Sequence, residues 1–476
     1  MNAIDKIIGY FAPKAGLVRA QHRAAMAIME RGYDAARRTA KNKGWRIIDN
    51  TGAELEEREE LRRKSRNMYQ NNPYAKRAHQ TLKNNTVGTG ILPAIADDRT
   101  KKIWKEWAES TLADFDEKLD FYGLQSLVTE TMTVHGDVLV LRVRNVDKKR
   151  APLELKILTS RFLDRSRDTP KGASGGWVIG GIQFAANGKR EGYWIYDQDP
   201  SNSYAKGVFW KKEDVIHLYE VLEPGQAMGI PLGVSSILSL RDYDDYAAAQ
   251  LMRQKIAACF SVFITENDTV AAPSGVQENH LERVEPGIIE HLPPGKSVTF
   301  ASPPPAEGYA EYSRNVLTGI ASGFGTTYEA MTGDLSNVNF SSGRMGWLEF
   351  NRTIESLQWF VLIPRFCKVV YAWFVEAAVM AQLLPPGTPT VCEWTAPRRQ
   401  MIDPVKETNG LLAQVRAGFV SWPEAVRQLG YTPEEIIEEM KAAAKMFDDA
   451  GLKPESDPRF DADKQPEKET NDNAED

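Results

Sequence analysis

The strongest constraint on this chain is a helical pattern that a polar loop interrupts and that then continues over a long distance. The loop, Thr332 to Ser342, contains no proline, and the helical pattern resumes from Gly343 to about Leu384. Connections between packed helices usually have about 2–8 residues, so a longer polar loop often has a function. Aromatic residues spread around more than one face of the long helix, which predicts neighbours on several sides. Pro364 lies inside this helix and should kink or break it.

Size and composition predict a multi-part globular protein. The chain has 476 residues, more than the ~250–300 at which a single core stops growing, so two to four structural units are expected. An apolar content of 42% with 26% charged residues suits a soluble protein. Three cysteines without CxxC spacing favour a reducing compartment and make structural zinc improbable. The most apolar segment is interrupted by Arg365, Lys368 and Glu376, so no membrane span is expected.

Charge is distributed unevenly along the sequence. Residues 1–80 contain 17 Lys and Arg against 9 Asp and Glu, whereas residues 455–476 contain 3 against 9. A basic arm can bind nucleic acid or an acidic partner, but it is more often a solvated face. The acidic tail has almost no large apolar residues and is expected to stay unfolded. We therefore expect a basic N-terminal arm at residues 1–49 and a disordered acidic tail at residues 455–476.

Residues 50–234 are expected to form an α+β domain. Five short segments rich in β-branched and aromatic residues predict strands: DVLVLRV, PLELKIL, GWVIGGIQF, GYWIYD and DVIHLYE. Before them, Leu124, Leu127 and Val128 share one predicted apolar helical face. Helical patterns follow at residues 235–259 and 306–331, on either side of a β-type insert at residues 260–305. Residues 385–454 are helical again, with Ser421 and Thr432 as N-caps.

One segment imitates a nucleotide-binding loop. In PPGKSVTF, Gly295, Lys296 and Ser297 match the end of a P-loop, but Glu290 occupies the position where the motif needs its first glycine. A strand pattern rather than a helix follows. We therefore interpret this segment as a turn and expect no ATP binding or hydrolysis by this chain alone.

No other pattern indicates catalysis, a cofactor or a metal. His135 and Asp137 in HGD are more easily explained as structural residues at a helix end, since no nucleophile motif accompanies them. His217 lies in a strand pattern and should be packed. The remaining histidines show no HxxxH or HxH spacing. The sequence thus predicts an architecture and no enzyme.

Several segments, in their order along the chain, resemble the lambda-type family of tailed bacteriophage portal proteins. They are NNPYAKRAHQTLKNNTVGTGI, HGDVLVLRV, VLEPGQAMGIPLGVSSIL, EPGIIEHLPPGKSVTFASPPP and GFGTTYEAMTGDLSNVNFSSGR. The resemblance extends from about residue 15 to residue 455. Lys296 departs from the family pattern, where an acidic residue is usual. That difference concerns only the surface charge of the insert.

The resemblance implies a mainly helical α+β portal fold with named parts. Residues 50–234 would be the wing, 235–259 and 306–331 the two stem helices, and 260–305 the clip. Residues 332–342 would be the tunnel loop, 343–384 the long kinked helix and 385–454 the crown. The implied channel-lining residues are Thr332, Gly333, Asp334, Leu335, Ser336, Asn337, Val338, Asn339, Phe340, Ser341 and Ser342. Arg344 is a possible phosphate contact, although an ion pair within or between subunits is favoured, and Glu290, Lys296 and Ser297 would face the partners of the clip.

The family also implies a function and partners. Its members form a ring, usually of twelve subunits, at one capsid vertex, and double-stranded DNA passes through the ring during packaging and ejection. The implied partners are the chain itself, DNA, the terminase large subunit, a major capsid or scaffold protein, and head completion or connector proteins. The location would be the virion, and the host cytoplasm during assembly. Gly333 and Gly343 are expected to let the loop bend.

Two other functions each fit part of the sequence. A packaging ATPase such as a terminase subunit would need the complete P-loop that Glu290 disrupts. A DNA-binding structural virion protein that forms no ring would explain the basic arm but not the polar loop. Particle mass separates these alternatives, since a ring is many times heavier than the 53.3 kDa chain.

Overall fold

The computed structural model describes residues 52–145, 151–169, 175–258, 262–266, 296–300, 308–397, 403–454, 457 and 459. The chain divides into two compact units, Met1–Leu55 and Glu56–Asp476, and the second contains nearly all of these residues. The expected basic arm, most of the expected clip and nearly all of the acidic tail lie outside the described residues.

In the first half of the second unit, α-helices come first and two antiparallel sheets follow. The early helices are α3 (Gly52–Asn71), α4 (Pro73–Val87), α5 (Asp98–Ala108) and α6 (Phe121–His135). One sheet has the order β3–β2–β8, with β2 at Asp137–Val143, β3 at Glu154–Leu158 and β8 at Val215–Tyr219. The other is β4 (Trp177–Ile179), β5 (Ile182–Phe184), β6 (Arg190–Tyr196) and β7 (Gly207–Lys211) in sequence order. All five predicted segments therefore contain strands, although GWVIGGIQF forms two strands, β4 and β5, that pair with each other. The α+β class is confirmed.

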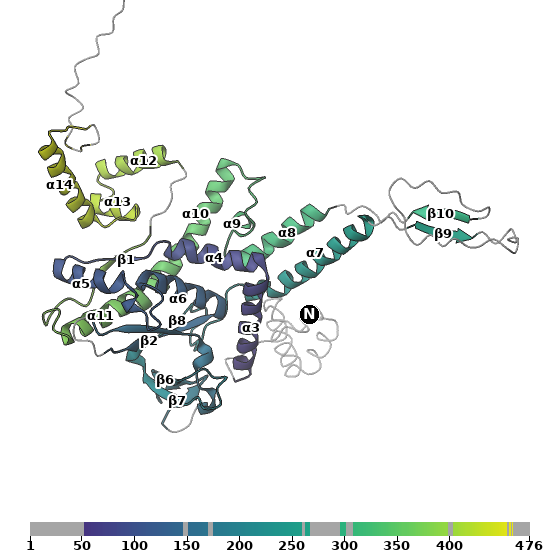
Figure 1. Cartoon of the computed structure of the whole chain (residues 1–476), viewed down its shortest axis with the longest axis horizontal. Coiled ribbons are helices and arrows are strands. Elements are labelled where there is room, and N and C mark those ends of the chain that lie inside the picture. The colour runs from purple at the N-terminus through teal and green to yellow at the C-terminus, as the bar shows by residue number, and fades with distance from the viewer. Residues whose placement is uncertain are drawn as a thin grey trace, which may run out of the picture. The chain divides into compact units, whose positions relative to one another are not determined.

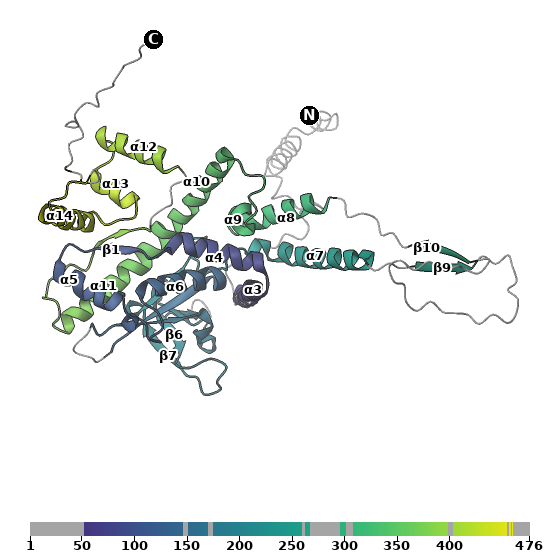
Figure 2. The same ribbon diagram turned by 45° about the horizontal axis from the view of Figure 1, so that its top comes forward.

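Helices dominate the second half. They are α7 (Ile237–Ala258), α8 (Tyr309–Gly323), α9 (Tyr328–Thr332), α10 (Phe340–Ser356), the π-helix η8 (Leu357–Cys367), α11 (Lys368–Met380), α12 (Pro404–Arg416), α13 (Trp422–Gln428) and α14 (Pro433–Ala450). Helices α7 and α8 lie side by side (Figures 1 and 2). Between them in sequence, β9 (Val262–Glu266) pairs antiparallel with β10 (Lys296–Phe300). A short pair, β1 (Leu92–Ala94) with β11 (Glu393–Thr395), joins segments far apart in the chain.

The long helix is irregular around Pro364. The chain stays helical through the proline, but residues Leu357–Cys367 form a π-helix between two α-helices. Proline has no N–H to donate and its ring collides with the preceding turn, so ordinary α-helical bonding cannot continue through it. A π-helix is rare and is usually found where such a local conflict, or a function, requires it. The irregularity that Pro364 was expected to cause, as a kink or a break, is here a change of helix type.

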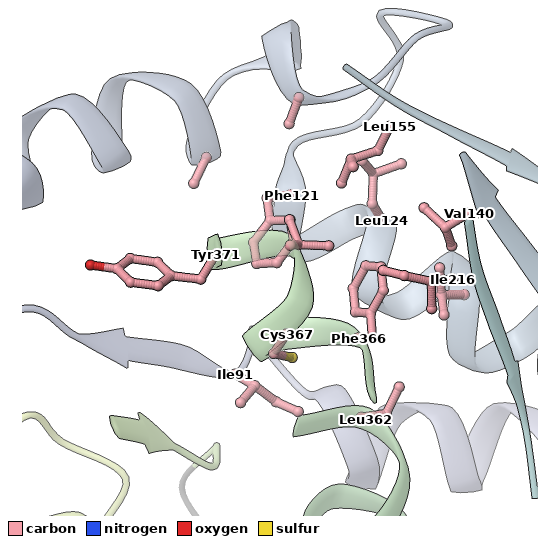
Figure 3. Packing of buried hydrophobic residues seen from close by; sticks show 14 of the residues in the cluster. Ile91, Phe121, Leu124, Val140, Leu155, Ile216, Leu362, Phe366, Cys367 and Tyr371 are labelled. Atoms are coloured by element: carbon pink, nitrogen blue, oxygen red, sulfur yellow. The ribbon is translucent and has the colours of Figure 1, made fainter. Parts of the chain in front are cut away.

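An aromatic core holds this π-helix and α11 against α5, α6 and the β3–β2–β8 sheet. The ring centroid of Trp104 lies 5.0 Å from that of Phe374 and 5.2 Å from that of Phe121, which stacks on Phe366. These four side chains are almost fully buried, and Figure 3 shows Phe121 and Phe366 among their apolar neighbours. Burying one such ring stabilises the fold by about 1.5–3 kcal/mol. Residues 357–380 are therefore the centre of the structure, and α10 extends from that centre.

A second apolar cluster fixes α7, α8 and α9 to α4. It contains Ala75, Ala78, Leu240, Tyr243, Leu317, Ile320, Ala321, Phe324 and Met331. Gly233 precedes α7 with φ of 75°, and a Cβ there would come within 2.2 Å of the Phe324 ring. Only glycine satisfies both the left-handed backbone and this close approach. By contrast Leu127, which the spacing placed on the apolar face of α6, is exposed.

His79 of α4 should make the stability of the fold depend on pH. Burial between the rings of Tyr69 and Phe324 lowers the pKa of His79 from 6.5 to about 4. Between these values the unfolded chain binds a proton that the folded chain does not, so stability falls as pH decreases below about 6.5. We expect His79 to account for a loss on the order of 2 kcal/mol between pH 7 and pH 5.

Thermal unfolding of wild type and His79→Phe at the two pH values measures this contribution. The variant should lose less stability on acidification, whereas the exposed control Lys102→Gln should lose as much as wild type. An equal loss in His79→Phe and wild type would show that His79 does not titrate as its burial requires.

Candidate functional site

The polar loop between α9 and α10 begins with a left-handed glycine. Thr327 caps α9 by accepting a hydrogen bond from the Ala330 backbone N–H at 3.2 Å, and Gly333 ends it with φ of 79°. The Gly333 N–H donates to the Glu329 carbonyl at 2.8 Å. Thus Gly333 stands where a left-handed residue must turn the chain out of α9.

The carboxylate of Asp334 holds the turn at Ser336. Its Oδ1 accepts hydrogen bonds from the Ser336 N–H at 3.0 Å and from the Ser336 hydroxyl at 2.6 Å. Its Oδ2 accepts one from the Tyr328 hydroxyl at 3.1 Å. The Ser336 and Tyr328 hydrogen bonds lower the pKa of Asp334, and Arg314 adds a smaller effect. The first half of the loop is therefore structured, not freely mobile.

The end of the loop differs from the sequence expectation. Asn339 is the N-cap of α10: its side-chain oxygen accepts from the Ser342 N–H at 2.8 Å, and the Ser342 hydroxyl accepts from the Asn339 N–H at 3.2 Å. This reciprocal capping box places Phe340, Ser341 and Ser342 in the first turn of the helix. Gly343 is helical too, and a Cβ there would lie 2.9 Å from a methyl of Val338. Gly343 thus serves close packing and is not the flexible end that we expected.

The residues that remain outside helices are largely exposed and nearly uncharged. Leu335 is 66% exposed, and Ser336, Asn337 and Asn339 are exposed as well. Asp334 is the one charged residue from Thr332 to Ser342. The loop therefore offers hydroxyl, amide and apolar groups to whatever passes it, without a cation to hold a phosphate.

Arg344 is exposed on α10, just beyond the loop. Hydrogen bonds from Lys406 lower the pKa of the Asp403 carboxyl, and the guanidinium of Arg344 contributes to the same shift. Both residues line a groove of ≈ 860 Å³ between α10 and the helices α12 and α13. Arg344 thus acts on the charge of Asp403, and both expected roles, ion-pair partner and phosphate contact, stay predictions.

The residues expected on the clip are only partly described. Lys296 and Ser297 open strand β10, where they pair with Glu266 and Thr265 of β9. Glu290 lies outside the described residues. Since a P-loop lysine must open a helix, the strand at Lys296 agrees with the interpretation as a turn.

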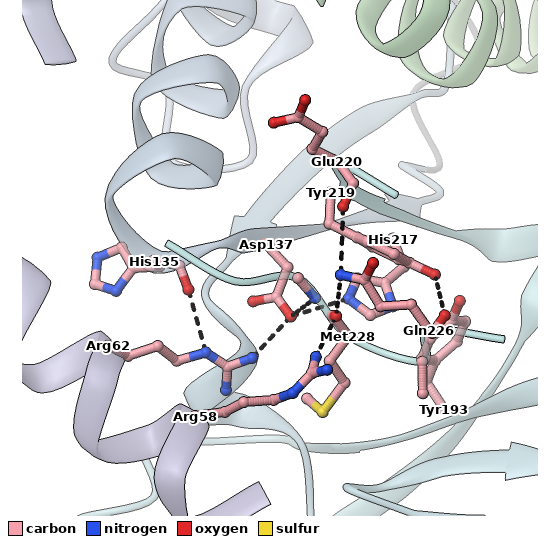
Figure 4. Close-up of polar contacts among 12 residues, drawn as sticks. Arg58, Arg62, His135, Asp137, Tyr193, His217, Tyr219, Glu220, Gln226 and Met228 are labelled. Carbon is pink, nitrogen blue, oxygen red and sulfur yellow. Dashed lines mark hydrogen bonds and ion pairs between the residues drawn. The ribbon is translucent and has the colours of Figure 1, made fainter. Parts of the chain in front are cut away.

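A buried charged cluster explains the HGD segment. Asp137 of β2 is fully buried; its Oδ2 accepts a hydrogen bond from Arg62 of α3 at 2.9 Å and lies 3.2 Å from Nε2 of His217 on β8 (Figure 4). The backbone carbonyl of His135 accepts from Nε of Arg62 at 3.1 Å. Asp137 and His217 are thus structural residues that tie α3 to the sheet.

The electrostatics of this Asp137 cluster agree with a structural role. Burial alone would raise the pKa of Asp137, but the positive charge of Arg62 and the hydrogen bond with His217 hold that pKa well below its usual value. Burial also lowers the pKa of His217, although Asp137 opposes that change. The carboxylate therefore stays ionised and paired. Sequence reasoning missed this cluster, because only the pairing of β2 with β8 brings Asp137 and His217 together.

Neither a metal-binding cluster of side chains nor a membrane-spanning helix is present in the described part of the chain. Within it, no group of three or more His, Cys, Asp or Glu side chains could hold a metal ion. In the same residues no helix combines the length and the apolar character that a bilayer crossing requires.

Known proteins resemble this chain over most of its length. Residues 38–358 match the model of the family described as phage portal protein, lambda family. The probable portal protein of Halomonas phage phiHAP-1 is 23% identical and is aligned over 89% of this chain and 88% of its own length. Portal protein B of Escherichia phage lambda is 21% identical, with 77% of each chain covered.

A solved structure shares the fold. The neck of a native GTA particle, computed with C12 symmetry, includes a chain that aligns with a TM-score of 0.50 and 17% identity, covering 79% of this chain and 94% of the other. Together with the matched family model, the architecture defines a viral portal-type protein. The chain belongs to the lambda family of phage portal proteins.

Removing the charge of Asp137 should destabilise the fold strongly. In Asp137→Asn the buried guanidinium of Arg62 would lose its buried counter-ion and keep only Glu59, 3.7 Å away; breaking a buried ion pair typically costs about 3–5 kcal/mol. The exposed pair of Arg352 with Glu349, whose nitrogen and oxygen lie 2.9 Å apart, provides the control. Arg352→Gln should cost less than about 1 kcal/mol. Chemical denaturation measures the free energy of unfolding of both variants. A similar decrease in the two variants would contradict a structural role for the Asp137 cluster.

Proposed function

We propose that this chain is the subunit of a portal ring at a capsid vertex, through which double-stranded DNA is packaged and ejected. Family membership supports this function. The single structural observation that carries it is the exposed, structured and nearly uncharged loop Gly333–Asn339 at the start of α10. Duplex DNA carries a charge every ~1.7 Å, so a strongly basic loop would bind phosphates and slow sliding. Hydroxyl and amide groups contact a moving backbone without holding it.

The parts of the chain receive their roles within this proposal. Residues 50–234 form the wing, α7 and α8 the stem, the insert between them the clip, and residues 385–454 the crown. Residues 332–342 line the channel, with Phe340–Ser342 contributing from the first turn of α10. The clip meets the terminase large subunit and later the head completion proteins, and the wing or arm meets the capsid or scaffold.

Exposed apolar side chains support self-association. On α10 and η8, the helices that lead into the main core, Met345 is 70% exposed, Trp359 50% and Phe360 74%. Large exposed apolar residues along a central helix are typical of a surface that another protein covers. The twelvefold symmetry of the related particle neck supports a dodecamer, and it also supports a location in the virion.

A channel role for the loop predicts a salt-dependent defect. Leu335→Lys with Asn337→Lys adds two cations per subunit and avoids the hydrogen bonds that Asp334 and Asn339 make. Each new phosphate contact strengthens the hold on DNA most at low salt. We expect rings that assemble normally but translocate DNA several-fold more slowly at ~50 mM salt than at ~200 mM.

In vitro packaging with purified capsids and terminase measures the translocation rate. The neutral variant Leu335→Gln with Asn337→Gln should package like wild type at both salt concentrations. If the lysine variant packages at the wild-type rate throughout, or if it disrupts the ring instead, the loop is not the channel surface.

A ring interface on η8 predicts an assembly defect. Phe360→Asp places a charge on the exposed apolar surface and should lower the fraction of assembled rings by roughly ten-fold or more, since burying one unpaired charge costs several kcal/mol. Phe360→Leu should keep assembly. Light scattering after size exclusion gives the masses, and circular dichroism checks the fold. A wild-type mass distribution for Phe360→Asp would remove this surface from the interface.

A further inference from the structure

Three side chains from different segments meet at the beginning of the loop. Arg314 lies on α8, Tyr328 on α9 and Asp334 in the loop itself. The guanidinium carbon of Arg314 lies 4.8 Å from the centroid of the Tyr328 ring, and its Nη1 lies 3.9 Å from Oδ2 of Asp334. The same Oδ2 accepts the hydrogen bond of the Tyr328 hydroxyl.

These contacts form a continuous connection between a stem helix and the loop. Arg314 is about one-third exposed, with 34% of its side-chain surface accessible, so the contact lies at the surface yet is partly shielded from water. A planar guanidinium can stack on an aromatic face and point its N–H groups toward a carboxylate at the same time, which a lysine cannot do. Cation–π contacts of this kind contribute modestly at exposed sites. Here one ion pair and one hydrogen bond reinforce it.

Asp334 passes this restraint on to the loop. The Oδ1 atom of the same carboxylate holds the N–H and the hydroxyl of Ser336. The Asp334 N–H donates to the Thr332 hydroxyl at 3.2 Å, and that hydroxyl donates to the Tyr328 carbonyl at 2.8 Å. A displacement of Arg314 or Tyr328 therefore shifts the carboxylate on which the turn at Ser336 depends.

We propose that Arg314 and Tyr328 are positioning residues that clamp Asp334 to helix α8, so that the stem sets the conformation of the loop. This Asp334 clamp rests on the proposed function only in that the loop is taken to meet DNA. Its consequence is mechanical: a movement of α8 reaches the loop directly through side chains, and not only through the backbone of α9.

Hydrogen exchange of the purified full-length protein tests the clamp without DNA. The Ser336 and Val338 amides donate to Asp334 Oδ1 and to the Leu335 carbonyl, so they exchange when the turn opens. Arg314→Gln and Tyr328→Phe should each accelerate exchange in peptides covering residues 333–339 by roughly 3- to 10-fold. The control Arg352→Gln, whose partner Glu349 lies on α10, should leave those peptides unchanged.

A double-variant cycle separates positioning from a general loss of structure. If the clamp acts through Asp334, combining Arg314→Gln with Asp334→Asn should accelerate exchange little more than either change alone. Additive effects of the two substitutions would overturn the proposal. Exchange at the wild-type rate in both Arg314→Gln and Tyr328→Phe would also overturn the proposal. Tyr328→Phe is the milder change and serves as the test if Arg314→Gln does not fold.

DNA packaging by the same variants distinguishes the clamp from the proposed function. Variants that assemble into rings, exchange faster in the loop and package or retain DNA poorly support both. Faster exchange with normal packaging supports the clamp and counts against the channel assignment. Normal exchange in both variants refutes the clamp, whatever the packaging result.

Discussion

The packing of one aromatic helix against the sheet is the constraint on which the rest of the structure depends. Phe366 and Phe374 are buried among Trp104 and Phe121, so η8 and α11 cannot turn or slide without opening the main core. Closely packed protein interiors transmit displacements instead of absorbing them. Because α10 continues directly into η8, the direction of α10 follows from this core. The position of the polar loop at the other end of α10 follows in turn.

Two separate clusters then restrain the elements around that helix. The Asp137 cluster ties α3 to the β3–β2–β8 sheet, and the apolar cluster around Phe324 ties α7, α8 and α9 to α4. The loop is thus bounded on one side by a helix rooted in the main core and on the other by helices rooted in the second cluster. Its two ends belong to differently anchored parts, which is the arrangement that a movable contact between them requires.

Local signals made much of this fold predictable from the sequence. The strands, the cap at Ser421 and the helical content depend on residues close in sequence. Thr432 precedes α14 as expected, but its side chain makes no capping hydrogen bond. The loop was recognised because small polar residues interrupt a long apolar pattern. Its end was placed three residues too late, because the reciprocal bonds of Asn339 and Ser342 extend α10 into a segment with little helical character of its own. The Asp137 cluster joins residues 75 and 80 positions apart, and Arg314 is 20 positions from Asp334. These contacts depend on strand pairing or helix packing. Neither left a periodic signal.

The π-helix has a consequence for how this chain can change in length. A π-helical stretch accommodates one more residue than an α-helix of the same span, so Leu357–Cys367 holds a reserve of chain between the core and α10. If one residue of the π-helix is lost, the segment can return to α-helical winding. If one residue of α10 is lost, the residues that follow in the helix are rotated by about 100°, the angle between successive residues of an α-helix. Insertions and deletions among relatives should therefore be tolerated around Pro364 and selected against between Phe340 and Ser356. The π-helix would then absorb changes in chain length that would otherwise rotate α10.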